Sequence, residues 1–450
     1  MCLTNCSVGF VPGDVNDRPV AQNASPRDEG SDLKLSRADM DQTVHWSEFR
    51  GPTANGHAPN SEGAPIRWSE EEGVRWKTEI PLIGWSSPAI VGNQIWLTTS
   101  PKEGHDFYAV QVNADTGQIV YNERIFHVED DQQESLNNEV NSFASPTPVV
   151  EEGRVYVHFG TYGTACIDTL TKEILWKRDD INIRHLRGPG ASPVLFEDFL
   201  ILNMDGLDHQ FQIALDKNTG ETKWTTSRSV VWNDFDKNGK IVREGDMRKS
   251  YTTPVLTEVN GEPLMISPGS FAFYGYDPRN GREVFKLRHG VYTPGMRPII
   301  HNNIMYAFAG YESAFFLAAR IDGTGDVTDT HEVWRIKGRH LSLIPSPTIV
   351  DDRLYLTSDK GTLFCLDPKT GEEIWTHRLG GSYTASAVYA GGNLYCFNTQ
   401  GKTTIIKPGP VPEEIAENRL DDGCMATPAM IGNSLVIRTK THLYRIDPPR

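Results

Sequence analysis

The stretch from Ser346 to Trp375, SPTIVDDRLYLTSDKGTLFCLDPKTGEEIW, contains each part of a pattern that recurs along this chain. A Ser-Pro pair opens it, and the run RLYLTSD then alternates apolar and polar residues, which is typical of a half-buried β-strand. The turn that starts at Asp367 ends at Gly371, shortly before Trp375. Asp can accept backbone N–H bonds at the start of a turn, and Gly supplies the positive φ that closes a hairpin. The stretch therefore predicts successive antiparallel strands joined by tight turns.

The opening pair is the anchor of a repeat that returns about every 40 to 60 residues, a period typical of propellers and solenoids. Its copies are Ser87-Pro88, Ser145-Pro146, Ser192-Pro193, Thr253-Pro254, Arg297-Pro298, Ser346-Pro347, Ser386-Ala387 and Thr427-Pro428. The aromatic residue after each turn is expected to open the outer strand and to pack between neighbouring units. Four strands per unit and eight units predict an all-β, eight-bladed β-propeller of four-stranded antiparallel blades. Seven blades is the alternative, because Ala387 replaces the anchor proline and the same unit lacks the turn aromatic.

The two ends of the repeat region complement each other. Residues 73–78 resemble an outer strand with no inner strands before it, whereas the last unit stops after its inner strands at residues 447–450. Pairing of the N- and C-terminal strands would complete one blade and hide an exposed sheet edge. We therefore expect a disordered N-terminal tail over residues 1–45 and one propeller over residues 46–450. The segment from Trp46 to Pro52 is expected to lie against the closing blade.

Composition argues against several classes of protein. The formal net charge of −15 disfavours a nucleic-acid partner, since binding phosphates requires clustered Lys and Arg. No apolar run is long enough for a transmembrane segment. The N-terminus carries no clear signal peptide. The six cysteines include no adjacent pair, and Cys166, Cys365 and Cys396 are expected to act as small buried hydrophobes in strands.

The alternation of DxxTGxxxW turns with SPxxxxxxxYL strands resembles the pyrroloquinoline-quinone (PQQ)-like repeat family, which includes quinoprotein alcohol dehydrogenases and BamB-like outer-membrane assembly lipoproteins. The resemblance covers residues 46–450 and includes the HFGTYG stretch at residues 158–163. It implies the propeller fold and an exported, periplasmic location. The quinoprotein enzymes of this family use PQQ with Ca²⁺, an Asp base and a disulfide between adjacent cysteines over the cofactor. This chain has no adjacent cysteines and no CxxCH haem motif, so the resemblance implies the fold more strongly than the cofactor.

The segments that enter the innermost strands are expected to converge on one mouth of the central channel. A ring of this kind suits an anionic or sugar-like ligand, or a peptide, through charge-assisted hydrogen bonds and stacking. The alternative is that the loops of a propeller face are polar only because they are solvated. The candidate ring consists of Trp85, Asn141, Arg187, Lys249, Tyr251, Arg297, His340, Tyr383 and Asp422.

An acidic insertion over residues 233–246 matches the first half of a calcium-binding loop. Asp234, Asp236 and Asn238 place oxygen ligands at alternate positions, and Gly239 allows the turn. The second half departs from the pattern, because Gly245 stands where a calcium loop has its Glu, and Glu244 would have to substitute. The favoured interpretation is an acidic loop with Asx turns.

Two functions compete at this stage. The leading hypothesis is a non-enzymatic propeller that binds a protein partner or a small cell-envelope ligand, as a scaffold or assembly factor similar to BamB and without a cofactor. It rests on the complete repeat frame and on the absence of a catalytic motif. The alternative is a PQQ- and calcium-dependent alcohol or sugar dehydrogenase, in which Arg187 or Arg297 would hold the quinone and Asp422 would act as base.

Overall fold

The computed structural model describes residues 44–129, 140–311, 314–338 and 344–449. The chain divides into a unit of Met1–Asp39, which lies outside the described residues, and a unit of Met40–Arg450, which contains all the elements below. The predicted tail over residues 1–45 therefore lies almost entirely outside the described residues. Described strands begin at Val44.

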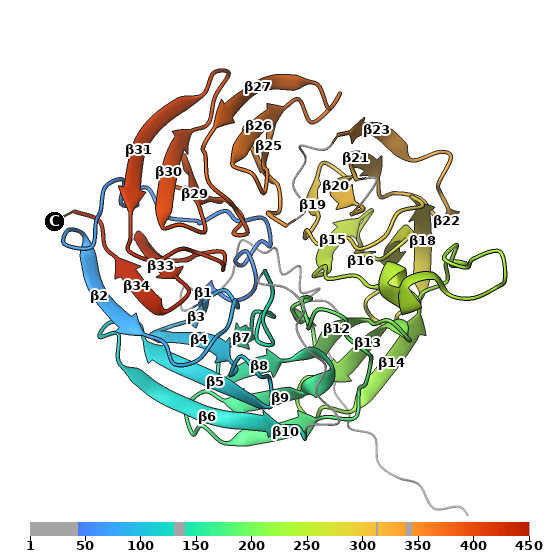
Figure 1. The fold of residues 1–450 in the computed structure, drawn as a ribbon, viewed down its shortest axis with the longest axis horizontal. Coiled ribbons are helices and arrows are strands. Elements are labelled where there is room, and N and C mark those ends of the chain that lie inside the picture. The colour runs from blue at the N-terminus through green and yellow to red at the C-terminus, as the bar shows by residue number, and fades with distance from the viewer. Residues whose placement is uncertain (1–43, 130–139, 312–313, 339–343, 450) are drawn as a thin grey trace, which may run out of the picture. The chain divides into compact units, whose positions relative to one another are not determined.

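Eight antiparallel sheets surround a central channel as the blades of a propeller, which confirms the predicted fold (Figure 1). From the channel outward, blades 1 to 4 contain β3 (Ala89–Val91), β4 (Gln94–Thr99), β5 (Asp106–Asn113) and β6 (Ile119–His127); β7 (Val149–Glu151), β8 (Arg154–His158), β9 (Thr164–Asp168) and β10 (Ile174–Arg178); β11 (Val194–Phe196), β12 (Phe199–Asp205), β13 (Gln210–Asp216) and β14 (Thr222–Ser227); and β15 (Val255–Val259), β16 (Glu262–Pro268), β17 (Ala272–Tyr276) and β18 (Glu283–Arg288).

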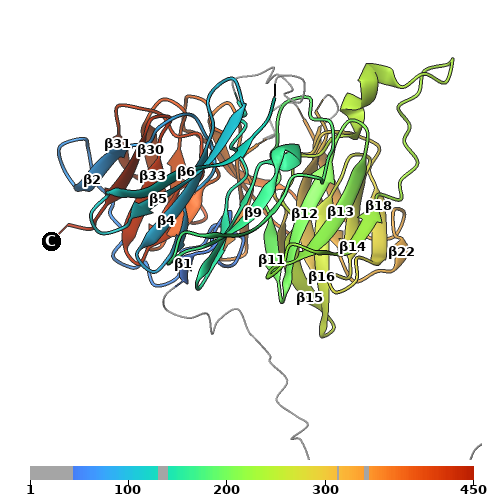
Figure 2. The ribbon, with the colours of Figure 1, turned by 90° about the horizontal axis from the view of Figure 1, so that it is seen from below.

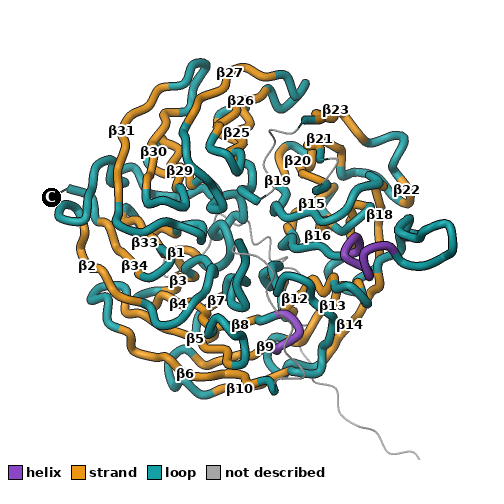
Figure 3. The backbone as a smooth tube through the Cα atoms, in the orientation of Figure 1, coloured by secondary structure: helices purple, strands orange, loops and turns teal. Residues whose placement is uncertain are grey.

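Blades 5 to 8 contain β19 (Ile299–His301), β20 (Ile304–Ala309), β21 (Phe315–Arg320) and β23 (Glu332–Lys337); β24 (Thr348–Val350), β25 (Arg353–Thr357), β26 (Thr362–Leu366) and β27 (Glu373–Arg378); β28 (Val388–Ala390), β29 (Asn393–Phe397), β30 (Lys402–Lys407) and β31 (Glu413–Arg419); and β32 (Ala429–Ile431), β33 (Ser434–Arg438), β34 (His442–Ile446) and β2 (Val74–Glu79). The short strand β22 (Gly325–Asp326) adds to blade 4 in parallel with β18. Two short 3-10 helices, η2 (Gly160–Tyr162) and η3 (Val242–Arg248), complete the described secondary structure (Figure 3).

The antiparallel order gives the ring two different faces (Figure 2). Every blade starts its inner strand from one face, which we call the entry face. The turns between the second and third strands also lie there, as does the insertion that links β14 to β15. The turns between the first and second strands and between the third and fourth strands lie on the opposite, hairpin face.

The hydrophobic core is divided into layers between neighbouring blades. Each cluster of buried residues in the described chain combines side chains from adjacent blades, such as Tyr156 and Cys166 of blade 2 with Leu200 and Leu215 of blade 3. Cys166, Cys365, Cys396 and Cys424 are free and buried in these layers, as the strand pattern predicts for the first three. Because each layer needs two blades, no blade can bury its apolar surface alone.

A relay of hydrogen bonds joins the anchors at the channel. The backbone N–H of Ser346 donates to the Ser386 hydroxyl at 2.9 Å, and the N–H of Ser386 donates to the Thr427 hydroxyl at 3.0 Å. The same bond links six of the eight blade boundaries. In blade 2 the hydroxyl belongs to Thr147, so the anchor there is Thr147-Pro148 and not the predicted Ser145-Pro146.

A second set of contacts joins the blades further out, as the turn motif predicts. The Trp176 indole N–H donates to the backbone oxygen of Lys217 in the next blade at 3.0 Å, and Trp334 donates to Pro368 at 2.9 Å. The glycine of the receiving turn lies against that indole. A Cβ on Gly220, whose φ is +75°, would come within 2.8 Å of the Trp176 ring. The motif therefore requires glycine both for its backbone conformation and for the room it leaves.

Blade 8 closes the ring as predicted. Strand β2 pairs with β34, with Lys77 opposite Tyr444, so the N-terminal strand completes the C-terminal blade. Strand β1 (Val44–Trp46) pairs with β3 of blade 1, while Trp46 packs in the core layer that includes the closing blade. The predicted position of this segment was therefore correct for its core contact and incomplete for its strand pairing.

Blade 7, whose sequence departs most from the repeat, is complete with β28 to β31. Ala387 lacks the proline ring, but Ser386 keeps both of its relay bonds. The turn of blade 7 still joins it to blade 6, because the backbone oxygen of Gly409 accepts the Trp375 indole N–H at 3.0 Å. Toward blade 8, where the missing aromatic would pack, Trp68 of the N-terminal part lies in the core layer and stacks on Tyr395. Eight blades, and not seven, are therefore present.

We predict that Ser386→Ala destabilises the fold by about 1–3 kcal/mol, because it leaves the buried Ser346 N–H without an acceptor. The free energy of unfolding from urea denaturation measures this loss. Ser386→Thr keeps the hydroxyl and should retain most of the stability. Ser382→Ala, an exposed serine in the same segment, is the matched control, and an equal effect of both alanine variants would contradict a role for the relay.

Candidate functional site

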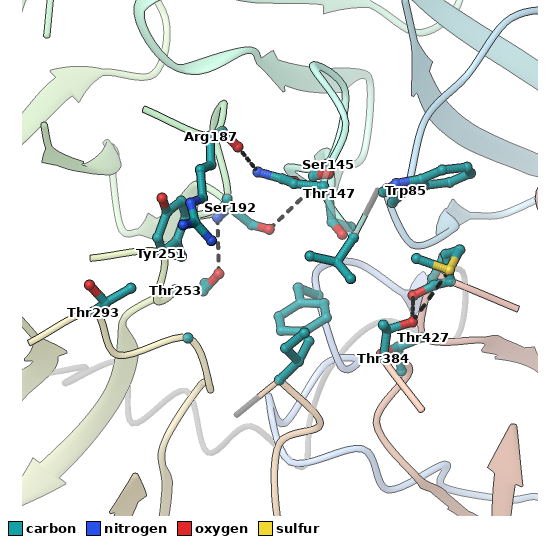
Figure 4. A pocket seen from close by; sticks show the side chains of 18 of the residues that line it. Trp85, Ser145, Thr147, Arg187, Ser192, Tyr251, Thr253, Thr293, Thr384 and Thr427 are labelled. Atoms are coloured by element: carbon teal, nitrogen blue, oxygen red, sulfur yellow. Dashed lines mark hydrogen bonds between the residues drawn. The ribbon is translucent and has the colours of Figure 1, made fainter. Parts of the chain in front are cut away.

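A cavity of about 290 Å³ lies on the channel axis at the entry face, and we call it the axial cavity (Figure 4). All eight blades contribute to it through equivalent positions. The residue two positions before each anchor lines the cavity in every blade. These residues are Trp85, Ser145, Gly190, Tyr251, Gly295, Ile344, Thr384 and Met425.

The rim of the axial cavity is apolar and exposed. Val140 and Tyr311 are 52% and 51% exposed and lie among the residues that line it. Phe49 lines it from the N-terminal segment. This segment bonds to residues within the inner strands, because the Ser47 oxygen accepts the Val150 N–H and the Arg50 guanidinium donates to Thr348. It therefore crosses the channel beyond the cavity, on the hairpin-face side.

Positive charge prevails in the cavity although the chain as a whole carries −15. The described lining contains Arg187 and Arg243, with Asp246 as its single carboxylate. Arg243 donates to the Tyr292 hydroxyl at 2.6 Å and lies over the same ring. The Arg187 guanidinium forms no hydrogen bond or ion pair with any described residue. An arginine in this state favours an acidic ligand.

Tyr251 and Trp85 lie on opposite sides of the cavity (Figure 4). Burial raises the pKa of Tyr251 and Asp246 adds to this effect, while the nearby Arg187 opposes it. The phenol therefore stays protonated at neutral pH and can act as a donor. Neither the Tyr251 hydroxyl nor the Trp85 indole N–H has a hydrogen-bond partner among the described residues.

Four members of the predicted ring line the cavity: Trp85, Asn141, Arg187 and Tyr251. Asn141 has a positioning role, because its amide donates to the backbone oxygens of Arg187 and Pro189 in the next entry segment. His340 lies outside the described residues. Asp422 lies outside the cavity lining and accepts a hydrogen bond from Thr441 at 2.7 Å.

The other three predicted members are buried and lie outside the cavity lining. The Lys249 amine lies 2.6 Å from Nδ1 of His185, and burial followed by the Lys249 charge holds the pKa of His185 well below its usual value. Tyr383 packs in the layer between blades 6 and 7. Arg297 forms an ion pair with Glu48 at 3.0 Å and also donates to the Phe49 and Pro254 oxygens.

Sequence reasoning missed Arg243 and Asp246 of the insertion, Phe49, and the Tyr292 and Tyr311 side chains. Spacing from the anchor was the signal for part of the lining, since every residue two positions before an anchor faces the channel. The insertion gave no such signal, because its residues follow no repeat.

The side chains of the predicted calcium loop are engaged separately. The Asp234 carboxylate is 1% exposed and accepts two bonds from Arg248, at 2.7 and 3.0 Å. Asp236 accepts the backbone N–H groups of Asn238 and Lys240, which is an Asx turn and lowers the pKa of its carboxyl group. Glu244 is exposed. The geometry favours the acidic-loop interpretation, and the calcium site stays a prediction.

The axial cavity does not fit the PQQ–calcium centre that the resemblance implies. Calcium takes six to eight oxygen ligands, usually with several carboxylates, whereas the described lining offers only Asp246. No group of three His, Cys, Asp or Glu residues that could hold a metal occurs in the described part of the chain. The buried cysteines lie in different blades, so none pairs over the cavity.

The fold and cavity define an eight-bladed propeller with a binding pocket on its axis. The family model described as outer membrane protein assembly factor BamB matches residues 57–226, 186–377 and 274–409. The chain therefore belongs to this family of PQQ-like repeat propellers. It is 30% identical over 114 residues to the outer membrane protein assembly factor BamB of Burkholderia pseudomallei (strain K96243), a match that covers 25% of this chain and 29% of that protein.

Solved structures agree with the fold. BamB from Moraxella catarrhalis is 12% identical with a TM-score of 0.58, over 83% of this chain and 99% of that one. The quinohemoprotein alcohol dehydrogenase from Comamonas testosteroni is 12% identical with a TM-score of 0.64, over 93% of this chain and 83% of that one. At this identity the likeness concerns the fold alone. No described helix is long and apolar enough to cross a membrane.

We predict that Arg297→Ala unfolds more easily, by roughly 3–5 kcal/mol, because the Glu48 carboxylate loses its buried partner. Urea denaturation measures the change, and Arg282→Ala, on an exposed hairpin, is the control. The double variant Arg297→Met with Glu48→Gln should recover part of the loss. Unchanged stability of Arg297→Ala would mean that Arg297 does not tie the N-terminal segment to blade 5.

Proposed function

We propose that this chain is a non-enzymatic binding propeller that holds a protein partner at its entry face, as a scaffold or assembly factor of the cell envelope. One observation carries the proposal: the axial cavity opens at the entry face with an exposed apolar rim. Below this rim lies Arg187, whose guanidinium pairs with no described residue. Concave sites with apolar and aromatic walls and a few placed polar groups are typical of binding sites, and exposed apolar side chains are typical of protein interaction surfaces.

Membership in the BamB-like family supports a protein partner in the cell envelope. The relative from Burkholderia pseudomallei is named as an outer membrane protein assembly factor. The N-terminal segment crosses the channel on the hairpin-face side of the cavity. A partner would therefore enter from the entry face.

Site-specific photocrosslinking tests this proposal. We expect p-benzoylphenylalanine at Val140 or Tyr311, both on the rim, to form a discrete adduct in the cells that produce the protein. Leu170 and Val411 are the matched controls, because they are 84% and 66% exposed and lie in turns of the hairpin face. Equal adducts from both faces, or none from the rim positions, would contradict the proposal.

A PQQ-dependent dehydrogenase is the second candidate, and the uncommitted Arg187 is the observation that favours it. PQQ carries carboxylates that an arginine in the channel could pair with. The single carboxylate of the lining and the separated cysteines speak against it.

Titration of the purified protein with PQQ, with and without Ca²⁺, decides between the two candidates. We expect no saturable change in tryptophan fluorescence, and no increase of the melting temperature with Ca²⁺ alone, because Arg248 already neutralises Asp234. One-to-one binding of micromolar affinity would replace the binding propeller with the quinoprotein as the leading function.

A further inference from the structure

Buried anchor hydroxyls line the axial cavity in five consecutive blades, at Thr427, Ser87, Thr147, Ser192 and Thr253. The last three form an arc on the side of Arg187 (Figure 4). Thr147, Ser192 and Thr253 are at most 4% exposed and line the cavity in consecutive blades. Each hydroxyl oxygen accepts a backbone N–H from the preceding anchor, at 2.9 to 3.0 Å. The relay therefore uses these groups only as acceptors. No described residue accepts their own O–H protons.

Buried hydroxyl protons normally find an acceptor, from the protein, from water or from a ligand. The arc therefore presents donors to whatever occupies this side of the cavity. Arg187 lies on the same side, with Tyr251, Ser192 and Thr253 around it (Figure 4). Its guanidinium adds a positive charge and further donors that no described side chain engages.

This side of the cavity holds Arg187 and several O–H donors, and its lining includes a single carboxylate, Asp246, against the two arginines Arg187 and Arg243. A ligand that fits must bring negative charge and at least two acceptor oxygens close together, as a carboxylate does. The apolar rim and Phe49 require that this carboxylate be attached to an apolar body. At about 290 Å³ the cavity is of the size that takes a small group, such as a side chain with its carboxylate, and not a folded segment.

We propose that the arc of Thr147, Ser192 and Thr253, together with Arg187, binds the C-terminal carboxylate of a peptide whose last side chain is apolar. This inference rests on the proposed function, because it names the part of the partner that enters the axial cavity. The hydroxyls of three blades and the guanidinium of one entry segment would then share one pair of oxygens.

Isothermal titration calorimetry with N-acetyl-Leu-Phe and with its C-terminal amide tests the proposal. The two peptides differ only in the charge and the acceptor oxygens of the terminal group. We expect the free acid to bind roughly tenfold or more tightly than the amide, since a charge-assisted bidentate bond is lost in the amide. Equal binding of acid and amide, or binding of neither, would overturn the proposal.

Three arginine variants locate the site. Arg187→Gln should abolish the preference for the acid, and Arg187→Lys should restore part of it, because lysine keeps the charge but not the planar fork. Arg282→Gln changes the net charge by the same amount on an exposed hairpin and should leave the preference intact. The Arg187 side chain makes no bond that the fold needs, so unchanged melting temperatures should accompany these results. Full acid preference in Arg187→Gln would also overturn the proposal.

A third ligand separates this inference from the proposed function. N-acetylphenylalanine presents the same carboxylate without a peptide chain before it. Acid preference with tighter binding of the dipeptide, together with rim crosslinks, supports both. If N-acetylphenylalanine binds as tightly as the dipeptide acid and no rim crosslinks form, the ligand is a free small acid. In that case the carboxylate chemistry would stand and the proposed protein partner would be rejected. Rim crosslinks without acid preference would reject the inference that a carboxylate binds in the cavity and would leave the proposed protein partner standing.

Discussion

The hydrogen bond from the backbone N–H of one anchor to the hydroxyl of the next is the constraint on which the rest of the ring depends. The inner strands meet where the chain is most crowded, and a buried backbone donor there needs an acceptor. A Ser-Pro or Thr-Pro pair solves this locally, because the first residue exchanges one bond with each neighbour and proline brings no N–H of its own. The repeat is therefore recognisable in sequence, since each blade must carry both halves of the same bond.

Arginines replace this bond at the two remaining boundaries. Arg297 stands at the anchor of blade 5 and donates from its side chain to Pro254 of blade 4. Arg438 of blade 8 donates to Ser86 and Thr98 of blade 1. A buried guanidinium has more donors than one boundary can use, and Arg297 directs its others to Glu48 and Phe49. Arg297, which stands where other anchors have Ser or Thr, therefore also holds the N-terminal segment across the channel.

The blades, their number and their closure were predictable because each follows from a local pattern that repeats. The turn from Asp216 to Gly220 shares two bonds with its copies at Asp277 and Asp367: the aspartate side chain accepts the N–H two residues on, and its backbone oxygen accepts the N–H of the glycine. A complementary half-blade at each end implies closure. Side-chain direction was less predictable. Lys249 and Tyr383 stand at other spacings from their anchors than Trp85 and Tyr251 and are buried between blades. Arg297 is itself the anchor residue of blade 5, and its side chain bonds to the N-terminal segment. Their polar or aromatic character alone could not show this.

Function in such a ring has to come from what breaks its symmetry. Eight equivalent positions two residues before the anchors build the wall of the axial cavity. Two of these residues are glycine, and none of the others is charged. The charged residues come from elsewhere: Arg187 from an entry segment, and Arg243 and Asp246 from the insertion after blade 3. They gather over blades 3 and 4, where the relay also leaves Ser192 and Thr253 with unused protons. A ligand that binds through its charge would therefore lie to one side of the channel axis, although the cavity itself is centred on that axis.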